Sequence, residues 1–210
     1  MKGILNLLKR AVQARSGDDR ADSVMFTTAF AEMAAEGATL TPWEARANES
    51  GAKRMSAARG LKLLQSLWAK DKYMCRLDDA AIGRLERFFE FATVPQGREI
   101  IGQDEYGNFM VVLLTGTIAV DRVQPWGEAL RLTEARPGDI LGEMSLLDSG
   151  LRFSKCTTLN ECQIAVLGAC ELDEMMTADP LLAANLIALL ARKLSLRLRV
   201  VSARLTDTRA

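Results

Sequence analysis

The sequence predicts an α+β fold in which helices flank a central antiparallel β structure. Apolar residues recur at helical spacing before about residue 91 and again after Glu171. Between Gly97 and Val166, short runs of Val, Ile, Leu and Thr alternate with Gly, Asn, Asp and Pro, which is typical of antiparallel strands joined by tight turns. With 210 residues, 49% of them hydrophobic, the chain is long enough for one domain with a real core and an extension.

Residues 1–60 are expected to form a helical extension that precedes the domain. Met1–Val12 places its apolar residues on one helical face, and a second helix is expected from about Ala21 to Ala35, ending at Gly37. A third helix is expected to start at Thr41-Pro42, where Glu44 three residues after Thr41 completes a capping box. Interruptions of the chain after this start are predicted at Gly51 and at Gly60.

The segment Met1–Val12 also raises the alternative of an amphipathic anchor on a membrane surface. Its basic residues are few, so packing against the domain is the favoured interpretation. Lys9 and Arg10 interrupt the apolar residues and no convincing cleavage site follows, which argues against a secretory signal. The longest apolar run, Leu181–Ala191, is too short to span a bilayer. We therefore expect a cytoplasmic protein without a transmembrane segment.

The predicted domain, residues 61–205, begins with helices and continues with strands. Helical spacing is found over residues 60–91, where Asp78 or Asp79 is the expected cap of the second helix. The expected strands, with Asn160-Glu161 at the last turn, are Val111–Leu114, Thr117–Val120, Ala129–Leu132, Thr157–Leu159 and Gln163–Leu167.

A long helix is predicted at the end of the domain, from Pro180 to about Leu205. Its apolar stripe consists of Ile187, Leu190, Leu194, Leu198, Val201 and Leu205. Several of these residues are separated by eleven positions, a spacing that keeps an almost straight helix facing one partner. The first turns of the stripe are expected to pack on the β structure. Beyond about Leu196 we expect it to pack against the same helix of a second copy, which predicts a homodimer.

The segment from Gly142 to Ser154 carries the chemistry. It places one carboxylate, Glu143, and one guanidinium, Arg152, on either side of a short apolar run. A turn that leads into a short helix directs several backbone N–H groups at one point, and an arginine adds a planar donor suited to phosphate oxygens. The carboxylate repels phosphate and needs another partner, such as a sugar hydroxyl. Phosphate at one end and a ribose hydroxyl at the other describe a nucleotide.

This segment resembles the phosphate-binding cassette of the cyclic nucleotide-binding domain family, whose pattern reads roughly F-G-E-L-A-L-x-x-x-x-P-R-A-A. The resemblance implies that Glu143 binds the ribose 2′-hydroxyl and that Arg152 binds the cyclic phosphate. In the family, a hydroxyl next to the arginine can favour guanine. The residues of the implied ligand site are Gly142, Glu143, Met144, Ser145, Arg152, Phe153 and Ser154.

The resemblance covers roughly residues 62–203 and implies a jelly-roll β-barrel with a long closing helix. Several turns of the family occur in the expected order, at Gln96-Gly97, at Gln103–Asn108 and at Pro137-Gly138-Asp139. The residues Asp179–Leu182 and the apolar run that follows resemble the closing helix of the bacterial catabolite activator group. An ordered series of glycines of this kind is a specific signal, whereas a single Gly-Glu pair is not.

Four residues differ from the family pattern, namely Asp104, Leu141, Leu151 and Phe153. They support an alternative, in which the domain is a degenerate, ligand-free fold that acts as a protein-interaction module. Both charged residues keep the family spacing, however, and hydrogen bonds to charged groups contribute about 1.5–3 kcal/mol each. Such bonds supply most of the roughly 8 kcal/mol of a micromolar affinity, so binding is the favoured interpretation.

Composition excludes several kinds of chemistry. The chain has no histidine, and its four cysteines show no C-x-x-C spacing, so neither a zinc site nor a Ser-His-Asp or Cys-His arrangement is expected. No G-x-x-x-x-G-K-[ST] motif is present, which leaves ATP hydrolysis without a candidate site. The net charge is zero and gives no general attraction for nucleic acid. We expect no enzyme and no cofactor other than the ligand.

The sequence therefore predicts a non-enzymatic sensor of cAMP or cGMP that signals to a partner protein through a helix rearrangement. cAMP is favoured by its frequency in the family, and a cyclic dinucleotide is left open. The partner is expected to bind the N-terminal helices or the closing helix. Arg192, Lys193 or Arg197 of that helix are expected to reach the base. DNA binding is less favoured, because no helix-turn-helix follows the closing helix before Ala210.

Overall fold

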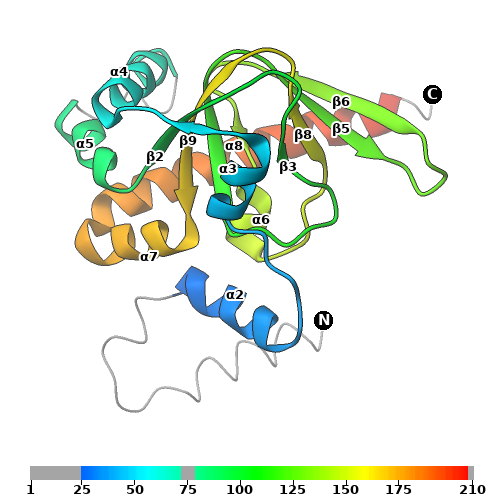
Figure 1. The fold of residues 1–210 in the computed structure, drawn as a ribbon, viewed down its shortest axis with the longest axis horizontal. Helices are drawn as coiled ribbons and strands as arrows, with labels where there is room; N and C mark the ends of the chain where they lie inside the picture. The colour runs from blue at the N-terminus through cyan, green and yellow to red at the C-terminus, as the bar shows by residue number, and fades with distance from the viewer. Residues whose placement is uncertain (1–24, 72–78, 208–210) are drawn as a thin grey trace.

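The computed structural model of the chain describes residues 25–71 and 79–207. Figure 1 shows two antiparallel sheets at the centre, with helices around them and the longest helix behind them. The predictions made for Met1–Val12, for Asp78 and for the side chain of Leu205 lie outside what the structure describes. The expected α+β class with antiparallel sheets and flanking helices is confirmed.

The strands are β1 (Lys53–Arg54), β2 (Glu90–Val94), β3 (Glu99–Ile101), β4 (Phe109–Thr115), β5 (Ile118–Val123), β6 (Ala129–Ala135), β7 (Ile140–Leu141), β8 (Lys155–Thr158) and β9 (Cys162–Gly168). One sheet has the order β1-β2-β9-β4-β7, and the other has the order β3-β8-β5-β6. Strands β5 and β6 form a hairpin, but β9 pairs with β2 and β4, and β8 pairs with β3 and β5, so the order is that of a jelly roll rather than of a simple meander.

Strand β4 lies at the middle of the core. It pairs with β9, with Met110 opposite Leu167 and Val112 opposite Ala165. Its side chains alternate between two apolar clusters, one against the helices and one between the sheets. Both faces of this strand are therefore buried, which explains why its sequence is an unbroken apolar run instead of an alternating one.

Strands β2, β3 and β7 are not predicted by the sequence. Phe88, Phe89 and Phe91 continue the helical spacing of the residues before them, so the sequence favours a helix up to residue 91. In the structure the short helix η3 (Leu85–Arg87) ends earlier, and β2 pairs with β9 along its whole length. Strands β3 and β7 have three and two residues, which is too short for a recognisable period.

The helices before the sheets are α2 (Met25–Ala35), α3 (Trp43–Ser50), α4 (Ala57–Trp68) and α5 (Asp79–Arg84). The predicted interruption at Gly60 is wrong, since Gly60 lies inside α4 and is needed there because a Cβ would collide with the ring of Phe91. The capping box at Thr41 is also wrong: Pro42 is the N-cap of α3 and no side chain caps it. The predicted end at Gly51 is confirmed, with a left-handed φ of 67°.

The division into residues 1–60 and 61–205 stays a prediction. Phe26 and Phe30 of α2 belong to the same apolar cluster as Leu64 of α4 and Met110 of β4. The described part of the extension thus packs into the core of the domain. A movement of α2 would therefore disturb the packing of α4 and β4.

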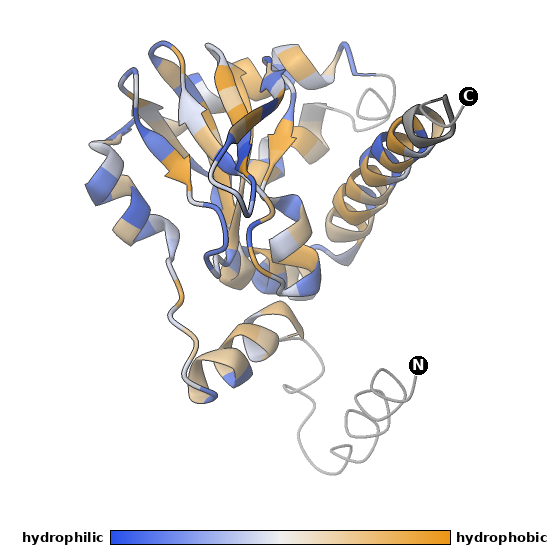
Figure 2. Cartoon of the chain, turned by 90° about the vertical axis from the view of Figure 1, so that its right-hand side faces the viewer, coloured by the Kyte–Doolittle hydropathy of each residue, from blue (hydrophilic) through white to orange (hydrophobic). Residues whose placement is uncertain are grey.

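Two helices follow the sheets, α7 (Ala169–Ala178) and α8 (Pro180–Asp207). The first turns of α8 are buried, as expected, with Leu186, Leu189 and Leu190 in the core. Its second half leaves the core, and Leu198 is 67% exposed. Figure 2 shows that orange, hydrophobic segments continue along α8 toward its C-terminal end. Among the described helices, none is long and apolar enough to cross a membrane.

Candidate functional site

The segment from residue 142 to residue 154, called the cassette below, begins with a left-handed glycine and a short helix. Strand β7 leads to Gly142, which has a φ of 76° and precedes helix α6 (Glu143–Asp148). A φ in this region favours glycine because it has no Cβ. Ser149 is the C-cap of helix α6, and the chain then returns toward β8 through Arg152. The predicted turn and short helix are confirmed.

Arg152 is buried inside the cassette with only 2% of its surface exposed. Its guanidinium donates to the carbonyl of Gly142 at 2.7 Å and to the carbonyl of Phe109 at 2.6 Å. It also lies over the ring of Phe109, 4.7 Å from the centroid. A Cβ at Gly107 would lie 2.6 Å from Nη2, so this glycine is required for the close packing of the arginine.

The charge of Arg152 has no carboxylate partner among the described residues. The ion pairs of the described residues do not include this arginine, although they include Arg46 and Arg197 nearby. Burial lowers the pKa of Arg152 to about 10, and the charges of Glu105 and Glu143 only partly oppose this effect. The side chain remains a cation at neutral pH. A buried cation held only by carbonyl dipoles is electrostatically prepared for an anion.

Glu143 is also buried, at 4% exposure, but its charge is paired. Its carboxylate accepts from Nη1 of Arg197, which projects from the second half of α8. Nη2 of Arg197 donates to the carbonyl of Ile140 at 2.8 Å. Burial raises the pKa of Glu143, and the attraction of Arg197, Arg152 and Lys193 does not fully compensate. The carboxylate is thus the point where the closing helix and the cassette meet.

The other residues of the predicted site differ in how far they are exposed to solvent. Ser145 is buried within α6, whereas Met144 and Phe153 have exposed side chains. Phe153 is 54% exposed, and the centroid of its ring lies 4.4 Å from Cζ of Arg122, so the ring packs on Arg122. The structure therefore brings Gly142, Glu143 and Arg152 together. Gly142 and Ser154 are partly exposed at the two ends of the cassette.

Arg197 and Lys193 of α8 lie near the cassette, and their contact with the base of a ligand stays a prediction. Arg197 binds Glu143, and Lys193 binds the carbonyl of Gly138 at 3.2 Å and the carboxylate of Asp71 at 3.2 Å. The sequence gives no signal for the pairing of Arg197 with Glu143, because the two residues are distant in the chain. Their proximity follows only from the return of α8 across the cassette.

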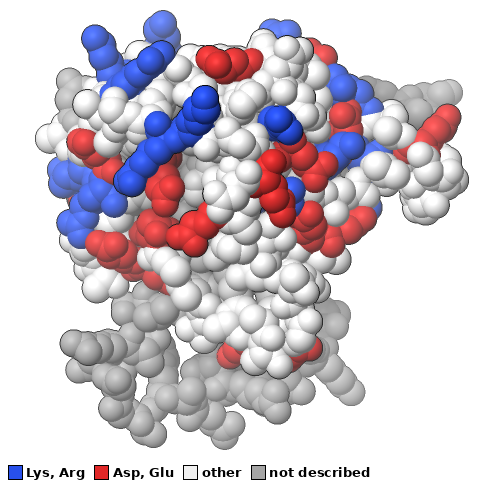
Figure 3. All heavy atoms as spheres, in the orientation of Figure 1, with Lys and Arg blue, Asp and Glu red and all other residues white. Residues whose placement is uncertain are grey.

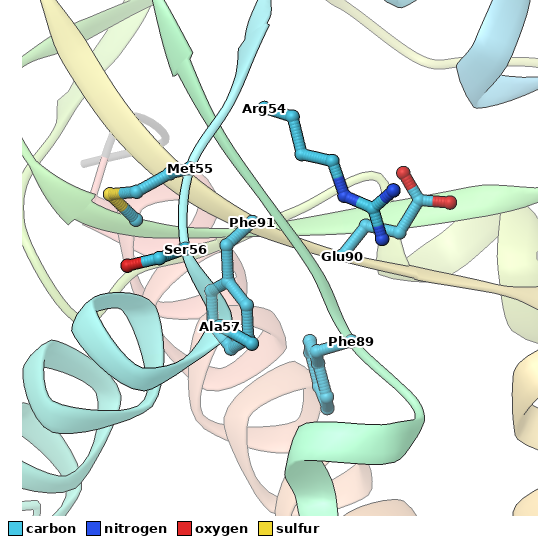
Figure 4. A pocket seen from close by; sticks show the side chains of 7 residues that line it. All are labelled: Arg54, Met55, Ser56, Ala57, Phe89, Glu90 and Phe91. Atoms are coloured by element: carbon cyan, nitrogen blue, oxygen red, sulfur yellow. The ribbon is translucent and has the colours of Figure 1, made fainter.

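A cavity elsewhere on the surface does not share these residues. It has a volume of about 320 Å³ and is lined by Arg54, Met55, Ser56, Ala57, Phe89, Glu90 and Phe91 (Figure 4). It lies where β1 leads into α4, and Arg54 and Glu90 are exposed at its edge. No group of three or more metal-ligating side chains occurs in the described part of the chain. The cassette is therefore the candidate site.

Comparison with known proteins agrees with this geometry. Residues 91–179 match the family model of the cyclic nucleotide-binding domain. The cyclic AMP receptor protein of Thermus thermophilus is 32% identical over 107 residues, which are 51% of this chain and 50% of that protein. The CRP-like cAMP-activated global transcriptional regulator of Mycobacterium tuberculosis is 27% identical over 118 residues, 56% of this chain and 53% of its own.

The chain spans about half the length of these curated relatives. Among solved structures, a cyclic nucleotide-binding domain from Methylobacillus flagellatus superposes with a TM-score of 0.67. The superposed region covers 73% of this chain and 86% of that domain, and the sequences are 20% identical. This likeness establishes that the two chains share a fold.

Proposed function

We propose that the chain, whose residues 91–179 match the cyclic nucleotide-binding domain model, is a non-enzymatic cAMP sensor in which Glu143 and Arg152 bind the ligand. The observation that carries the proposal is the buried guanidinium of Arg152, which has no carboxylate partner among the described residues. A cyclic phosphate carries one negative charge and two exocyclic oxygens. Such a group would neutralise the cation and satisfy its remaining donors.

Glu143 supplies the second contact of the proposal. Its carboxylate would accept a hydrogen bond from the ribose 2′-hydroxyl, while the backbone at Gly142, Met144 and Ser145 would complete the phosphate cradle. We favour cAMP over cGMP because both curated relatives are named for cAMP. In this proposal neither Glu143 nor Arg152 transfers a proton or forms a covalent bond, so the function requires no catalysis.

The pairing of Glu143 with Arg197 suggests how binding is transmitted. Arg197 binds Oε1 of Glu143, so a ribose hydroxyl at this carboxylate would compete with Arg197. Ligand binding would therefore weaken one of the contacts that hold the second half of α8 over the cassette. A ligand shifts this equilibrium only by the difference between its affinities for the two helix positions. The rearranged α8 or the N-terminal helices would present the surface that a partner protein recognises.

DNA contact is not part of the proposal, although the M. tuberculosis relative is named as a transcriptional regulator. Figure 3 shows Lys and Arg side chains interspersed with Asp and Glu on the face it displays. A mixed surface of this kind gives no continuous positive stripe for phosphates on that face.

Calorimetry tests the proposal directly. Wild-type protein is titrated with cAMP and compared with Arg152→Lys, which keeps the charge but loses the planar fork. The matched control is Arg59→Lys, an exposed arginine of α4. We expect wild-type and control proteins to bind with micromolar affinity and Arg152→Lys to bind about 10- to 100-fold more weakly. Absence of heat from the wild type with cAMP or cGMP at about millimolar concentration would instead favour the ligand-free interaction module.

A further inference from the structure

Arg46 of α3 is a buried arginine surrounded by carboxylates. Only 6% of it is exposed. Its guanidinium forms an ion pair with Glu105, a second with Glu49 at 3.0 Å and a third, longer one with Glu99 at 3.5 Å. Its Nε has no hydrogen-bond partner in the structure. A buried charge is retained only where its partners compensate for desolvation, so these acidic residues fix the position of Arg46.

Glu105 connects Arg46 to the cassette. It belongs to the turn between β3 and β4, and its carbonyl accepts from the backbone N–H of Arg152 at 2.8 Å. The neighbouring N–H of Asp104 donates to the carbonyl of Arg152 at 2.9 Å. The side chain of Glu105 folds back over Gly102, where a Cβ would collide with its carboxylate. One turn thus holds the backbone of Arg152 and presents a carboxylate to Arg46.

The charges of this group also reach the guanidinium of Arg152. Glu105 favours the charged form of Arg152, and Arg46 opposes it. Glu105 is therefore shared electrostatically by two buried arginines, but its ion pair is made with Arg46. In the structure Arg46 holds the carboxylate of Glu105, and the guanidinium of Arg152 is left with the carbonyls of Gly142 and Phe109 as its hydrogen-bond partners.

One aromatic contact and one backbone contact from the same part of the extension reinforce this arrangement. The ring of Trp43 packs edge-on against Phe109, with centroids 5.6 Å apart, and Phe109 is the ring beneath Arg152. The backbone of Tyr106 forms a β-bridge with Leu40 on one side and with Leu151 on the other. The segment from Leu40 to Arg46 therefore contacts both the ring and the turn on which the cassette arginine rests.

We propose that α3 prepares the phosphate site, because Arg46 engages the carboxylate of Glu105 and so leaves Arg152 available to a phosphate. The inference rests on the proposed function and adds a regulatory role for the extension. Arg46 is a positioning residue and does not touch the ligand. If a partner pulled α3 away, Glu105 would turn to Arg152, neutralise it and compete with the phosphate. Displacement of the extension would then lower the affinity for the nucleotide.

A set of charge-removing variants tests this competition by calorimetry with cAMP. We expect Arg46→Gln to weaken binding by about tenfold, because the freed Glu105 competes with the phosphate. Arg46→Gln combined with Glu105→Gln should recover an affinity within about threefold of Glu105→Gln alone. The matched control combines Arg46→Gln with Glu49→Gln, which removes the other close partner of Arg46, an exposed side chain, and should not restore binding.

The conservative variant Arg46→Lys separates this role from a general loss of packing. It keeps a cation beside Glu105 and is expected to bind cAMP within about threefold of the wild type. Thermal unfolding establishes that each variant is folded at the titration temperature. Wild-type affinity for Arg46→Gln, or a double variant no better than Arg46→Gln, overturns the inference while leaving the proposed function in place. A wild type that does not bind cAMP overturns both.

Discussion

Glu143 and Arg152 are both buried charged residues, yet the structure treats their charges differently. Arg152 is held by the carbonyls of Gly142 and Phe109, whereas Glu143 is paired with Arg197. Burial favours the neutral form of each, since it lowers the pKa of Arg152 to about 10 and raises the pKa of Glu143. Burial of both charges thus lowers the stability of the folded state, and it places a cation and an anion close together in one site.

The raised pKa of Glu143 predicts a pH dependence of stability. Between the ordinary glutamate value and the raised value, the folded protein binds more protons at this position than the unfolded chain does. The contribution of Glu143 to stability is therefore fully present below the ordinary value and is lost as the pH rises through the raised one. Glu143→Gln removes this loss.

Urea unfolding from about pH 4 to pH 8 measures the effect. The stability of Glu143→Gln relative to the wild type should increase as the pH rises across the window. Glu128→Gln, an exposed position on the turn between β5 and β6, serves as the control for loss of one negative charge. A relative stability that stays constant with pH, or that falls, contradicts the assignment.

The residues of the cassette could be found from the sequence because the chemistry is local. Gly142, Glu143 and Arg152 lie within one short segment, and their order carries the pattern. Arg46 and Arg197 could not be found in the same way. Their roles depend on long-range contacts, with Glu105 and Glu143 respectively, and an arginine on a helix surface has no sequence feature that distinguishes such a partner from solvent.

At the scale of elements, α8 is the feature that the sequence predicts best. Its eleven-residue spacing extends over enough turns to be recognised, and the helix runs from Pro180 to Asp207. Strand β2 shows the opposite case. Its five residues follow a helical apolar pattern, and only the pairing with β9 decides that they form a strand. Tertiary pairing overrides local spacing when an element is short.

The contact between α8 and the cassette leads to a prediction about Arg197. Arg197→Gln removes the side chain that competes with the ribose hydroxyl, so we expect a rise in cAMP affinity of up to about fivefold, because the half-exposed guanidinium of Arg197 is screened by water. The measurement is calorimetry at about pH 8. An alkaline pH is chosen because burial raises the pKa of Glu143 and the competition concerns its carboxylate form. Arg199→Gln, on the same helix, is the control. A weaker affinity for Arg197→Gln would mean that Arg197 contacts the ligand instead.

At the scale of the whole molecule, the exposed half of α8 predicts self-association. Leu198 and Val201 belong to the predicted stripe and are 67% and 51% exposed, and Leu196 and Val200 are exposed beside them. Apolar surface of this kind on a projecting helix is buried most readily against the same helix of a second copy. We therefore expect a homodimer formed through α8.

Sedimentation equilibrium checks this expectation. Leu198→Glu should shift the protein to monomer, because it places a charge in the apolar stripe. Arg199→Glu changes the charge by more but lies off the stripe, and it should remain dimeric. A wild type that sediments as a monomer at concentrations of about 100 µM would rule out a dimer of useful stability.

The arrangement of the whole domain was predictable because its turns are marked by glycines in a fixed order, and the sheets with their closing helix follow that order. The packing of the extension was not. Phe26 and Phe30 enter the core, and Trp43 and Arg46 contact Phe109 and Glu105 beside the cassette, although their sequence has no feature beyond helical spacing. A sequence can indicate that such a segment is a helix more easily than where the helix docks.

The central claim is that Glu143 and Arg152 together hold the ribose and the phosphate of one cyclic nucleotide. Calorimetry with cAMP and 2′-deoxy-cAMP, on the wild type and on Glu143→Gln, tests it most directly. We predict that the wild type binds cAMP about tenfold more tightly than the deoxy analogue, and that Glu143→Gln does not distinguish the two. Equal affinities for both ligands in the wild type would contradict the claim.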